Sequence, residues 1–493
     1  MRRPAPSVGR PVAPSHLPDG FVVRLRSDVR IRDNGRAIVG GSPTRVLYPS
    51  AKARGMFTER TIKVIDAGTR ALAERLLDAG MADPVLAELP DPQIPVADIT
   101  FVIPVWGRPG SLDRLLTSIP NGHPLIVVDD RSPDPDSIAS VAARHGARYV
   151  PLPENVGPGG ARNAGLELVS TPFVAFVDTD VVIDETVVPR LQRHFADRLV
   201  AVVAPRVLGL ADGTRTNWIG RYEAARSSLD LGPRAATVMQ RSPVSWVPAT
   251  FLLARVGALG DGFSPGMREG EDVDLIWRLV DGGWRVRYEP AARVWHDHRV
   301  TVGGWLSRKV LYGSSAHPLA VRHGRDIAPA VFAPWSATVV LALLAQRRWS
   351  VPVATLISAG AAIRIAAKLT RSSHPLAEGA RLTADGVGAS LTQTSALLVR
   401  HWWPAAVIAG VFSRRIRRAV IVAAVADAVI EYRRTRPKLD PIRFGFARRL
   451  DDLAYGAGVW LSAVRGTSAA ALLPDFTWRS KERRPPSAER GGG

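Results

Sequence analysis

The sequence predicts an α/β protein whose central domain is built on a largely parallel sheet, with a small unit before it and an apolar helical region after it. Three observations lead to this prediction. Short apolar runs alternate with helical patterns between residues 97 and 323. Hairpin and turn signals gather in residues 18–84, and apolar stretches flanked by arginine pairs begin after residue 325. The 493 residues are enough for about three domains.

The composition narrows the possible partners and chemistry. Lys and Arg total 65 against 45 Asp and Glu, a formal charge of +20, so we expect an anionic partner such as a nucleotide diphosphate, an acidic lipid headgroup or a nucleic acid. With 46% hydrophobic residues, the chain is expected to fold. It has no cysteine, which excludes disulfides, a thiolate nucleophile and a cysteine-based zinc site. The chemistry must therefore use oxygen and nitrogen groups.

The first part of the chain predicts a leader and a small domain. Residues 1–17 are rich in Arg and Pro and hold no apolar run, which indicates a disordered leader rather than a secretory signal and a catalytic part in the cytoplasm. Within residues 18–84, Asp33-Asn34-Gly35 interrupts alternating apolar and polar residues and favours a tight hairpin turn. A helical stripe of leucines lies in residues 69–79. We expect a unit of winged-helix type, separated from the central domain by a proline-rich linker.

Residues 97–323 predict the central domain. Its apolar runs lie at residues 99–105, 125–128, 148–152, 173–177 and 199–204. Helical patterns lie near residues 111–118, 136–145, 160–169 and 185–197. Because the runs are apolar on both faces, we expect strands covered on both sides, as in a largely parallel sheet. Ligands of such sheets bind at the carboxyl ends of the strands.

The C-terminal region, residues 325–481, is predicted to be helical and apolar. Ile327–Gln346 is close to the roughly 20 residues that a helix needs to cross a bilayer, whereas the later apolar stretches are shorter. Arginine pairs flank these later stretches, which suits helices lying on an anionic membrane surface. The alternative is an alanine-rich helical domain without membrane contact. The tail, residues 482–493, is expected to be disordered.

Two carboxylates come directly after the apolar run 173–177. Asp178 and Asp180 are two positions apart, so on a continuing strand they share a face and can hold one divalent cation, Mg²⁺ or Mn²⁺, on a diphosphate. The alternative is an ordinary turn. The position directly after a buried strand favours the cation site.

The run 125–128 also ends in acidic residues. Asp129 and Asp130 could accept hydrogen bonds from a uracil imide or from ribose hydroxyls, or could only cap a turn.

A glycine-rich segment opens the next helix. We expect donor binding here by Asn155, Gly157, Arg162 and Asn163, because a helix start favours anions and Arg162 could neutralise a phosphate. The segment matches neither the P-loop nor the dinucleotide-binding glycine pattern.

Two later segments supply further candidates. Asp272 lies in an acidic run that precedes a helical pattern, where it could deprotonate an attacking hydroxyl or only stabilise the helix start. His296 and His298 are two residues apart on either side of Asp297, so an imidazole could add a metal ligand, with His296 the candidate, or could orient a phosphate. A surface pair of histidines is the alternative.

At this spacing, the segments together resemble the inverting glycosyltransferases of family 2, which have the GT-A fold. The resemblance covers about residues 97–323. The segments that carry it are ITFVIPVWGRP (99–109), IVVDDRSPD (126–134), NVGPGGARNAGL (155–166), FVAFVDTDV (173–181) and GEDVDLIWRL (270–279). The Q-x-x-R-W signature of processive polysaccharide synthases is missing, with only Trp305 and Arg308-Lys309 nearby, so the resemblance does not extend to processive synthesis.

The resemblance implies a role for each matching residue. Pro104 and Val105 would line the base pocket, and Asp129 or Asp130 would hold the uracil or ribose. The cation on the sugar nucleotide would be held by Asp178 and Asp180, with Asp272 as the catalytic base of a single displacement.

A closer resemblance spans most of the chain from Leu17 onward. The segments LPDGFVVRLRSDVRIRD (17–33), VGGSPTRVL (39–47), VRYEPAARVWHDHR (286–299) and YGSSAHPLAVRHG (312–324) are similar to the mycofactocin-system glycosyltransferases of actinobacteria. In that family the N-terminal unit resembles PqqD-type peptide-recognition domains. The resemblance implies glucose transfer, with UDP-glucose as the expected donor, to a peptide-derived redox cofactor and a β-1,4-linked product.

Other functions stay open at this level. A nucleotidyltransferase could use the same cation site and release pyrophosphate, and a family 2 enzyme could instead act on polysaccharide or lipid. A cationic membrane-binding protein without turnover is a further alternative. No stacking aromatics interleave with the arginine clusters, so nucleic acid is not an expected partner. The N-terminal unit could hold a peptide along its hairpin edge or simply brace the central sheet.

Overall fold

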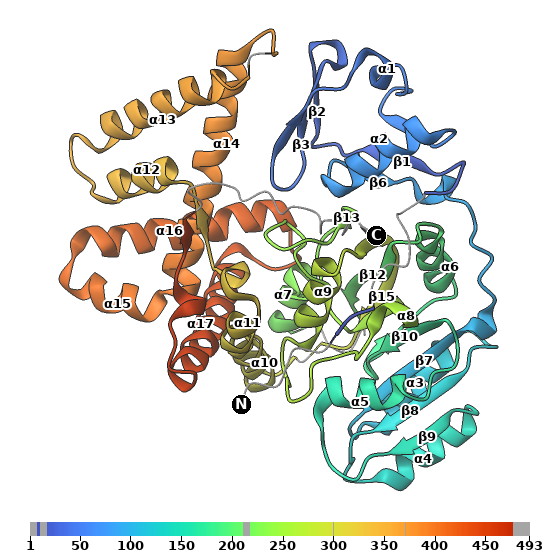
Figure 1. The fold of residues 1–493 in the computed structure, drawn as a ribbon. Helices are drawn as coiled ribbons and strands as arrows, with labels where there is room; N and C mark the ends of the chain where they lie inside the picture. Colours follow the sequence, from blue (N-terminus) through green and yellow to red (C-terminus); the bar gives the residue numbers. More distant parts are fainter. Residues whose placement is uncertain (1–6, 10–16, 211–216, 299, 370, 477–493) are drawn as a thin grey trace, which may run out of the picture.

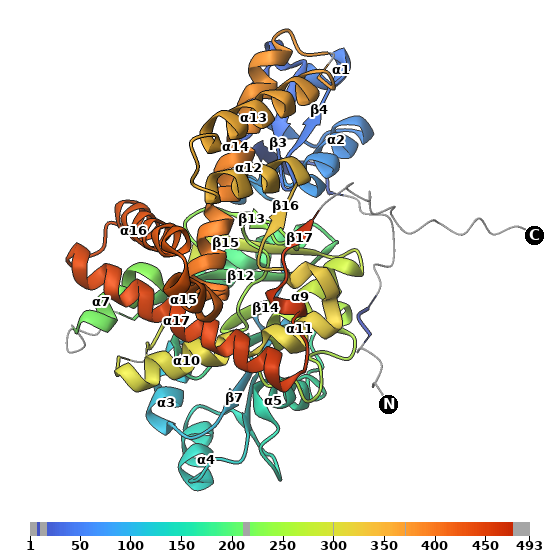
Figure 2. The ribbon, with the colours of Figure 1, turned by 90° about the vertical axis from the view of Figure 1, so that its left-hand side faces the viewer.

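The computed structural model describes residues 7–9, 17–210, 217–298, 300–369 and 371–476. Three parts are visible in Figures 1 and 2: an N-terminal unit, a central α/β domain and a C-terminal set of helices. The predicted tail and most of the predicted leader lie outside the described residues. Residues 7–9 lie against the central domain, where the N–H of Gly9 donates to the carbonyl of Ala258 (3.1 Å) and Ser7 binds Asp261.

The N-terminal unit consists of two small antiparallel sheets and two helices. One sheet has the order β5-β1-β6 and the other β2-β3-β4. Their bounds are β1 Val22–Leu25, β2 Arg30–Arg32, β3 Ala37–Gly40, β4 Arg45–Leu47, β5 Thr61–Lys63 and β6 Ala82–Pro84, with helices α1 Ala51–Arg54 and α2 Ala67–Asp78. The predicted hairpin forms between β2 and β3, with Asp33, Asn34 and Gly35 all at positive φ. Winged-helix type stays a prediction.

The central domain contains a sheet of nine strands. Eight form the order β11-β15-β12-β14-β10-β7-β8-β9, and β13 pairs with β15. The bounds are β7 Ile99–Val105, β8 Leu125–Asp129, β9 Arg148–Pro151, β10 Phe173–Val177, β11 Val181–Val182, β12 Val200–Gly209, β13 Ala236–Thr237, β14 Phe251–Arg255 and β15 Arg285–His296. The five predicted runs all form strands: β7 and β10 have the predicted ends, and the other three differ from them by at most five residues.

The prediction of a largely parallel sheet is right for only part of it. Strands β9, β8, β7 and β10 are parallel neighbours, but β14 runs antiparallel to both β10 and β12, and β11 antiparallel to β15. The sequence could not show this, because a strand buried on both faces is apolar throughout whichever way it runs. Four of the five residues of β14 are buried.

Helices cover both faces of this sheet and form two cores. One core packs on α3 (Pro109–Ser118), α4 (Pro135–Arg144) and α6 (Val187–Gln192). The other packs on α5 (Gly157–Leu166), α8 (Val256–Leu259) and α9 (Glu271–Asp281). The carboxyl ends of β7, β8 and β10 therefore meet the starts of α5 and α9 at one edge of the sheet.

The chain then continues into helices that pack mainly on one another. They are α10 Val302–Ser314, α11 Ala316–His323, α12 Pro334–Leu344, α13 Ser350–Ala366, α14 Pro375–Ala396, α15 Trp403–Phe412, α16 Arg414–Thr435 and α17 Pro441–Arg465, with α7 (Trp218–Arg226) of the central domain beside α17. A short parallel pair joins β16 (Val331–Phe332) to β17 (Asp475–Phe476). Helix α17 lies along α10 (Figure 2). It also contacts α7 of the central domain, and so connects the helical region to that domain.

The stretch Ile327–Gln346 does not form one long helix. It contains α12, which is 11 residues long. Within the described residues, no single helix has the length and apolar composition to cross a membrane; one bent pair, Pro375–His401 with Trp403–Phe412, meets that test jointly and turns by 91°.

Candidate active site

A large cleft lies where the three parts meet. Its volume is about 3590 Å³, and it opens at the carboxyl ends of the sheet strands. The residues predicted for the cation and the base, Asp178, Asp180 and Asp272, all line it. The cleft is also lined by residues 42–47 of the N-terminal unit, which lead into and form β4, and by residues of α14, α17 and β17. Three side chains from two distant parts of the sequence thus line one cavity.

Arg162 joins the two acidic edges of the cleft. It projects from α5, and its guanidinium is 3% exposed. Nη2 donates to Asp178 Oδ1 at the end of β10 (2.5 Å), and Nη1 donates to Glu271 Oε1 at the start of α9 (3.0 Å). A buried charge needs partners of opposite sign, so this arginine holds the strand end and the helix start at a fixed separation. That Arg162 also contacts a phosphate of the donor stays a prediction.

Asp180 is surrounded by positive groups. His296 Nε2 lies 3.3 Å from Asp180 Oδ1, and Arg108 Nη1 lies 3.4 Å from Oδ2. Burial alone would raise the pKa of this carboxyl, but attraction and hydrogen bonding from His296, with Arg308 and Arg108 also near, lower the pKa to about 2. Asp180 is therefore an anion at neutral pH.

His298 differs from His296. It lies 5.4 Å from His296 between ring centres and lines a small adjoining cavity. Burial, with the nearby charge of His296, lowers the pKa of His298 to about 3, so its ring is neutral at physiological pH.

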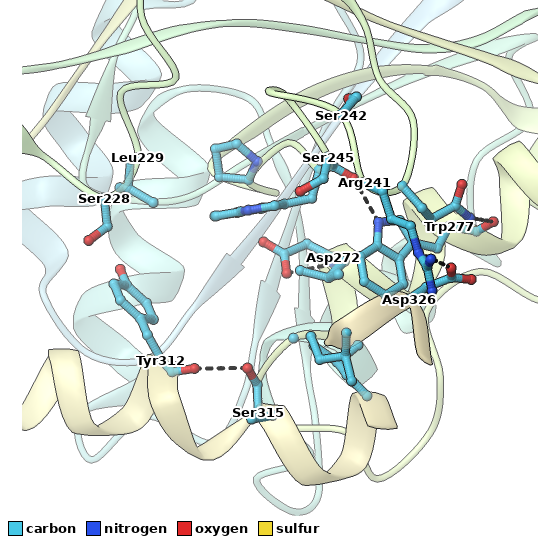
Figure 3. Close-up of a pocket in the computed structure, with 18 of the residues that line it drawn as sticks. Ser228, Leu229, Arg241, Ser242, Ser245, Asp272, Trp277, Tyr312, Ser315 and Asp326 are labelled. Carbon is cyan, nitrogen blue, oxygen red and sulfur yellow. Dashed lines mark hydrogen bonds and ion pairs between the residues drawn. The ribbon is translucent and has the colours of Figure 1, made fainter. Parts of the chain in front are cut away.

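Asp272 lies in the first turn of α9. The N–H of Ala249 donates to its Oδ2 (3.3 Å), and the N–H of Val273 donates to its Oδ1 (2.8 Å). Figure 3 shows the carboxylate between the loop of Ser242 and Ser245 and the side chain of Tyr312. Burial raises the pKa of Asp272 above its ordinary value, even though these hydrogen bonds favour the anion. A carboxylate with a raised pKa is a better proton acceptor.

Glu271, next to the predicted base, is a cleft residue that the sequence did not single out. Burial, and then the neighbouring charge of Asp272, raise the pKa of Glu271 to about 7, against the attraction of Arg162. The acidic run in the sequence was the available signal, but it does not show which carboxylate meets the arginine.

The other predicted donor-binding residues occupy different places. Pro104, Val105, Asn155 and Gly157 line the cleft. Asp130 lines it too, but its carboxylate accepts hydrogen bonds from the N–H groups of Val156 (2.7 Å) and Gly157 (3.0 Å) at the start of α5. Gly157 has a φ of +81°, which suits a residue without a side chain.

Asp129 and Asn163 lie behind the cleft wall. Asp129 accepts from the N–H of Ser132 (2.8 Å) and the hydroxyl of Tyr149 (2.8 Å). The side chain of Asn163 makes two hydrogen bonds to the backbone of Phe263. Both side chains support the strand and helix ends that form the wall; a direct contact with the donor stays a prediction.

The carboxylate pair suits a hard divalent cation. Asp178 and Asp180 are 28% and 14% exposed, so each offers oxygen to the cleft. Among the described residues, no three His, Asp or Glu side chains are placed to hold an ion by themselves. Mg²⁺ commonly takes one or two carboxylates and completes its shell with substrate phosphates and water. The pair therefore fits a cation that arrives with a diphosphate.

Helix α10 contributes cleft residues that no motif predicted. Arg308 and Tyr312 line the cleft, and the charges of Asp178 and Asp180 act on Arg308. Lys309, on the same helix, is buried against Glu223 of α7 (2.9 Å) and Asp451 of α17 (3.4 Å). The position of this helix depends on its packing against α17, so no local sequence pattern could signal these residues.

Comparisons with known proteins identify the family of the chain. The model of glycosyl transferase family 2 matches residues 100–259. The pre-mycofactocin glycosyltransferase of Mycobacterium tuberculosis is 40% identical over 472 residues, covering 94% of this chain and 99% of that protein. The chain therefore belongs to the family of the pre-mycofactocin glycosyltransferase.

Other similarities are more distant. The poly-β-1,6-N-acetyl-D-glucosamine synthase of Staphylococcus aureus is 23% identical over 45% of this chain and 56% of its own length. A mannosyltransferase from Pyrobaculum calidifontis, solved with GDP-mannose and Mn²⁺, is 17% identical and covers 62% of this chain and 89% of that one, with a TM-score of 0.35.

Membership of the family has two consequences. The protein is a glycosyltransferase of the mycofactocin system, and its central domain has the GT-A type of fold. The alternatives of a nucleotidyltransferase and of a binding protein without turnover are thereby set aside.

Proposed function

We propose that this glycosyltransferase moves glucose from UDP-glucose to the peptide-derived redox cofactor mycofactocin or its precursor, inverts the anomeric carbon, and builds a β-1,4-linked chain. The carrying observation is that Asp178 and Asp180 share one cleft with Asp272. An acidic pair able to hold a cation on a diphosphate and a separate, partly buried carboxylate are the two parts that a single displacement needs.

In this mechanism Asp272 accepts the proton of the acceptor hydroxyl. The hydroxyl oxygen then bonds to the anomeric carbon as the bond to the nucleoside diphosphate breaks on the opposite face. When bound, the divalent cation neutralises charge on the departing diphosphate. Arg108 and Arg308, near the acidic pair, add positive charge at that end of the cleft. The ion pair between Arg162 and Glu271 (3.0 Å) fixes the start of α9, where Asp272 lies.

The size of the cleft supports a bulky acceptor. Its 3590 Å³ is several times the roughly 300–1,000 Å³ of an ordinary small-molecule pocket. Residues 42–47 of the N-terminal unit, which lead into and include strand β4, form one wall, and β4 is paired with β3 on one side alone in the described part of the chain. A peptide-derived acceptor would therefore meet this unit while its hydroxyl reaches Asp272. Contact with the acceptor is favoured over bracing alone by this position, although Arg285 also binds Asp78 (2.7 Å) and so joins the unit to the sheet.

Product analysis tests the reaction. Purified protein is incubated with UDP-glucose, Mg²⁺ or Mn²⁺, and the unglycosylated acceptor from cells that lack this protein. We expect hexose increments on the acceptor by mass spectrometry and release of UDP. Release of pyrophosphate, or hexose found only on lipid or polysaccharide, would contradict the proposal.

We also propose that the protein works at the cytoplasmic face of the cell membrane. Helices α15 and α16 lie side by side at the margin of the molecule (Figure 1). They expose an apolar face made of Val407, Ile408, Val411, Phe412, Ile421, Val422, Val425 and Ile430. Exposed apolar side chains gathered in this number on two adjacent helices are typical of a surface that contacts a membrane or another protein. Arginines 414, 415, 417 and 418 begin α16 beside it and suit anionic headgroups.

Vesicle flotation tests this location. The wild-type protein should float with vesicles that contain phosphatidylglycerol and much less with phosphatidylcholine alone. The double variant Val411→Asp, Phe412→Asp should lose binding, whereas Ile65→Asp, at a 69% exposed position on the N-terminal unit, should not. Equal flotation of the double variant and the wild type would rule out the apolar face as the membrane contact.

A further inference from the structure

The loop between β13 and β14 forms the cleft wall beside the base. Several contacts fix it. Arg241 forms ion pairs with Asp326 (3.0 Å) and Asp475 (2.9 Å), and the indole N–H of Trp277 donates to the carbonyl of Ser245 (2.7 Å) (Figure 3). At its far end, the N–H of Ala249 donates to Asp272. The wall is therefore positioned before any acceptor arrives.

Trp246 lies in the middle of this wall. The residues around it, Val244 and Val247, are buried in the core, while Trp246 is half-buried and lines the cleft. Ala249 is three positions after Trp246, a chain length of at most about 11 Å. Among the described residues, no aromatic ring pairs with the Trp246 indole, and the cation contacts with aromatic rings involve other residues. The indole of Trp246 therefore has neither a ring partner nor a cation partner in the described part of the chain.

The other aromatic residues of the cleft are less suitable as a platform near Asp272. Trp277 packs edge-on against His323 (5.0 Å between ring centres) and donates its N–H to Ser245. The guanidinium of Arg400 covers Tyr455 at 3.8 Å. Trp106 comes directly after β7, at the donor end of the cleft. The guanidinium of Arg308 lies over the ring of Tyr312 (5.5 Å), and Phe476 pairs with Phe332 (6.3 Å between ring centres). Trp246 is therefore the aromatic residue near Asp272 that has no ring or cation partner among the described residues.

A hexose ring carries C–H groups on its faces, and their partial positive charge is attracted to the negative face of an indole. Asp272 takes a proton from an acceptor hydroxyl, so a sugar that is being extended must place its ring next to Asp272. We propose that Trp246 is the platform for the hexose already attached to the acceptor, so that the second and later transfers depend on Trp246 and the first does not. This inference rests on the proposed function.

The test compares two acceptors in solution. The unglycosylated acceptor reports the first transfer, and 4-nitrophenyl β-D-glucoside serves as the probe for extension. Trp246→Ala should raise the KM for the glucoside by about tenfold and shorten the products on the natural acceptor, while Trp246→Phe should retain most of the extension. Slow hydrolysis of UDP-glucose without acceptor reports an intact donor site and should stay at the wild-type rate. Trp349→Ala, at a half-exposed position outside the cleft wall, is the matched control.

The outcomes distinguish a failure of the Trp246 inference from a failure of the proposed function. If the wild-type protein extends the chain and Trp246→Ala does so with an unchanged KM and product length, the platform inference is wrong. It is equally wrong if Trp246→Ala loses UDP-glucose hydrolysis together with extension, because Trp246 would then serve the fold or the donor. If the wild-type protein transfers hexose to neither acceptor, the proposed function itself fails.

Discussion

The two ends of the cleft use the same side chain in opposite electrostatic settings. At one end, Asp180 faces His296 and Arg108, and its pKa is lowered. At the other end, burial raises the pKa of Asp272, and the groups that hold it are mostly backbone N–H donors. An anion that stays charged suits a cation and a diphosphate, whereas a destabilised anion suits proton transfer. The difference indicates that the residue type does not set the role; the neighbours do.

The largest effect is expected at the base. Asp272→Asn keeps the shape of the side chain but removes the proton acceptor, so turnover should fall by about 10²–10⁴ while UDP-glucose still binds. Steady-state rates and calorimetric titration of the nucleotide measure the two properties separately. Asp136→Asn, at an exposed position on α4, is the control. Turnover close to wild type would mean that Asp272 is not the base.

Arg162, which joins the two ends of the cleft, should contribute to the stability of the fold. Arg162→Met leaves Asp178 and Glu271 without their shared partner, so the free energy of unfolding should fall by about 3 kcal/mol. Arg148→Met, at an exposed position on β9, should change it by less than about 0.5 kcal/mol. Denaturant unfolding of both variants makes this comparison, and equal stability would show that the ends are held by other contacts.

A change at the donor end of the cleft should lower the affinity for the nucleotide. Asp180→Ala removes one of the two carboxylates available to a cation, so the affinity for UDP in the presence of Mn²⁺ should fall by at least about tenfold. The same variant titrated with UDP in the absence of metal should differ little from the wild type. A Mn²⁺-dependent affinity that is unchanged in Asp180→Ala would remove the proposed cation role.

Lowering the pH should have the smallest effect of the four changes, and it should remove turnover before nucleotide binding. As the pH falls, Asp272 with its raised pKa is protonated first and turnover is lost, whereas Asp180 with its lowered pKa stays ionised and nucleotide binding persists. Rates and UDP affinities measured between about pH 4 and 8 check the order of the two losses. Loss of binding at a higher pH than loss of turnover would reverse the assignment.

The sequence predicted the carboxylates of the site that follow the carboxyl ends of strands. Asp178, Asp180 and Asp130 come directly after buried strands, so their presence at one edge of the sheet is a consequence of topology alone. The partners of these residues could not be predicted in the same way. That Arg162 reaches Glu271, 109 residues away, depends on how α5 and α9 pack on the same face.

The C-terminal region was the least predictable. Its apolar runs were visible, but apolar character does not fix where a helix begins or ends, and Ile327–Gln346 is divided between strand β16 and the short α12. The cleft residues of α10 depend on Lys309, which is buried between α7 and α17. Such a network forms from three separate segments, and no local pattern in the sequence reports it.

The stereochemistry of the first product tests the central claim most directly. If Asp272 activates the acceptor on the face opposite the diphosphate end, glucose from the α-linked donor must appear in β linkage. The coupling constant of the anomeric proton in the purified product distinguishes the two configurations. A β product is expected; an α product would contradict the placement of the base and the leaving group on opposite sides of one hexose.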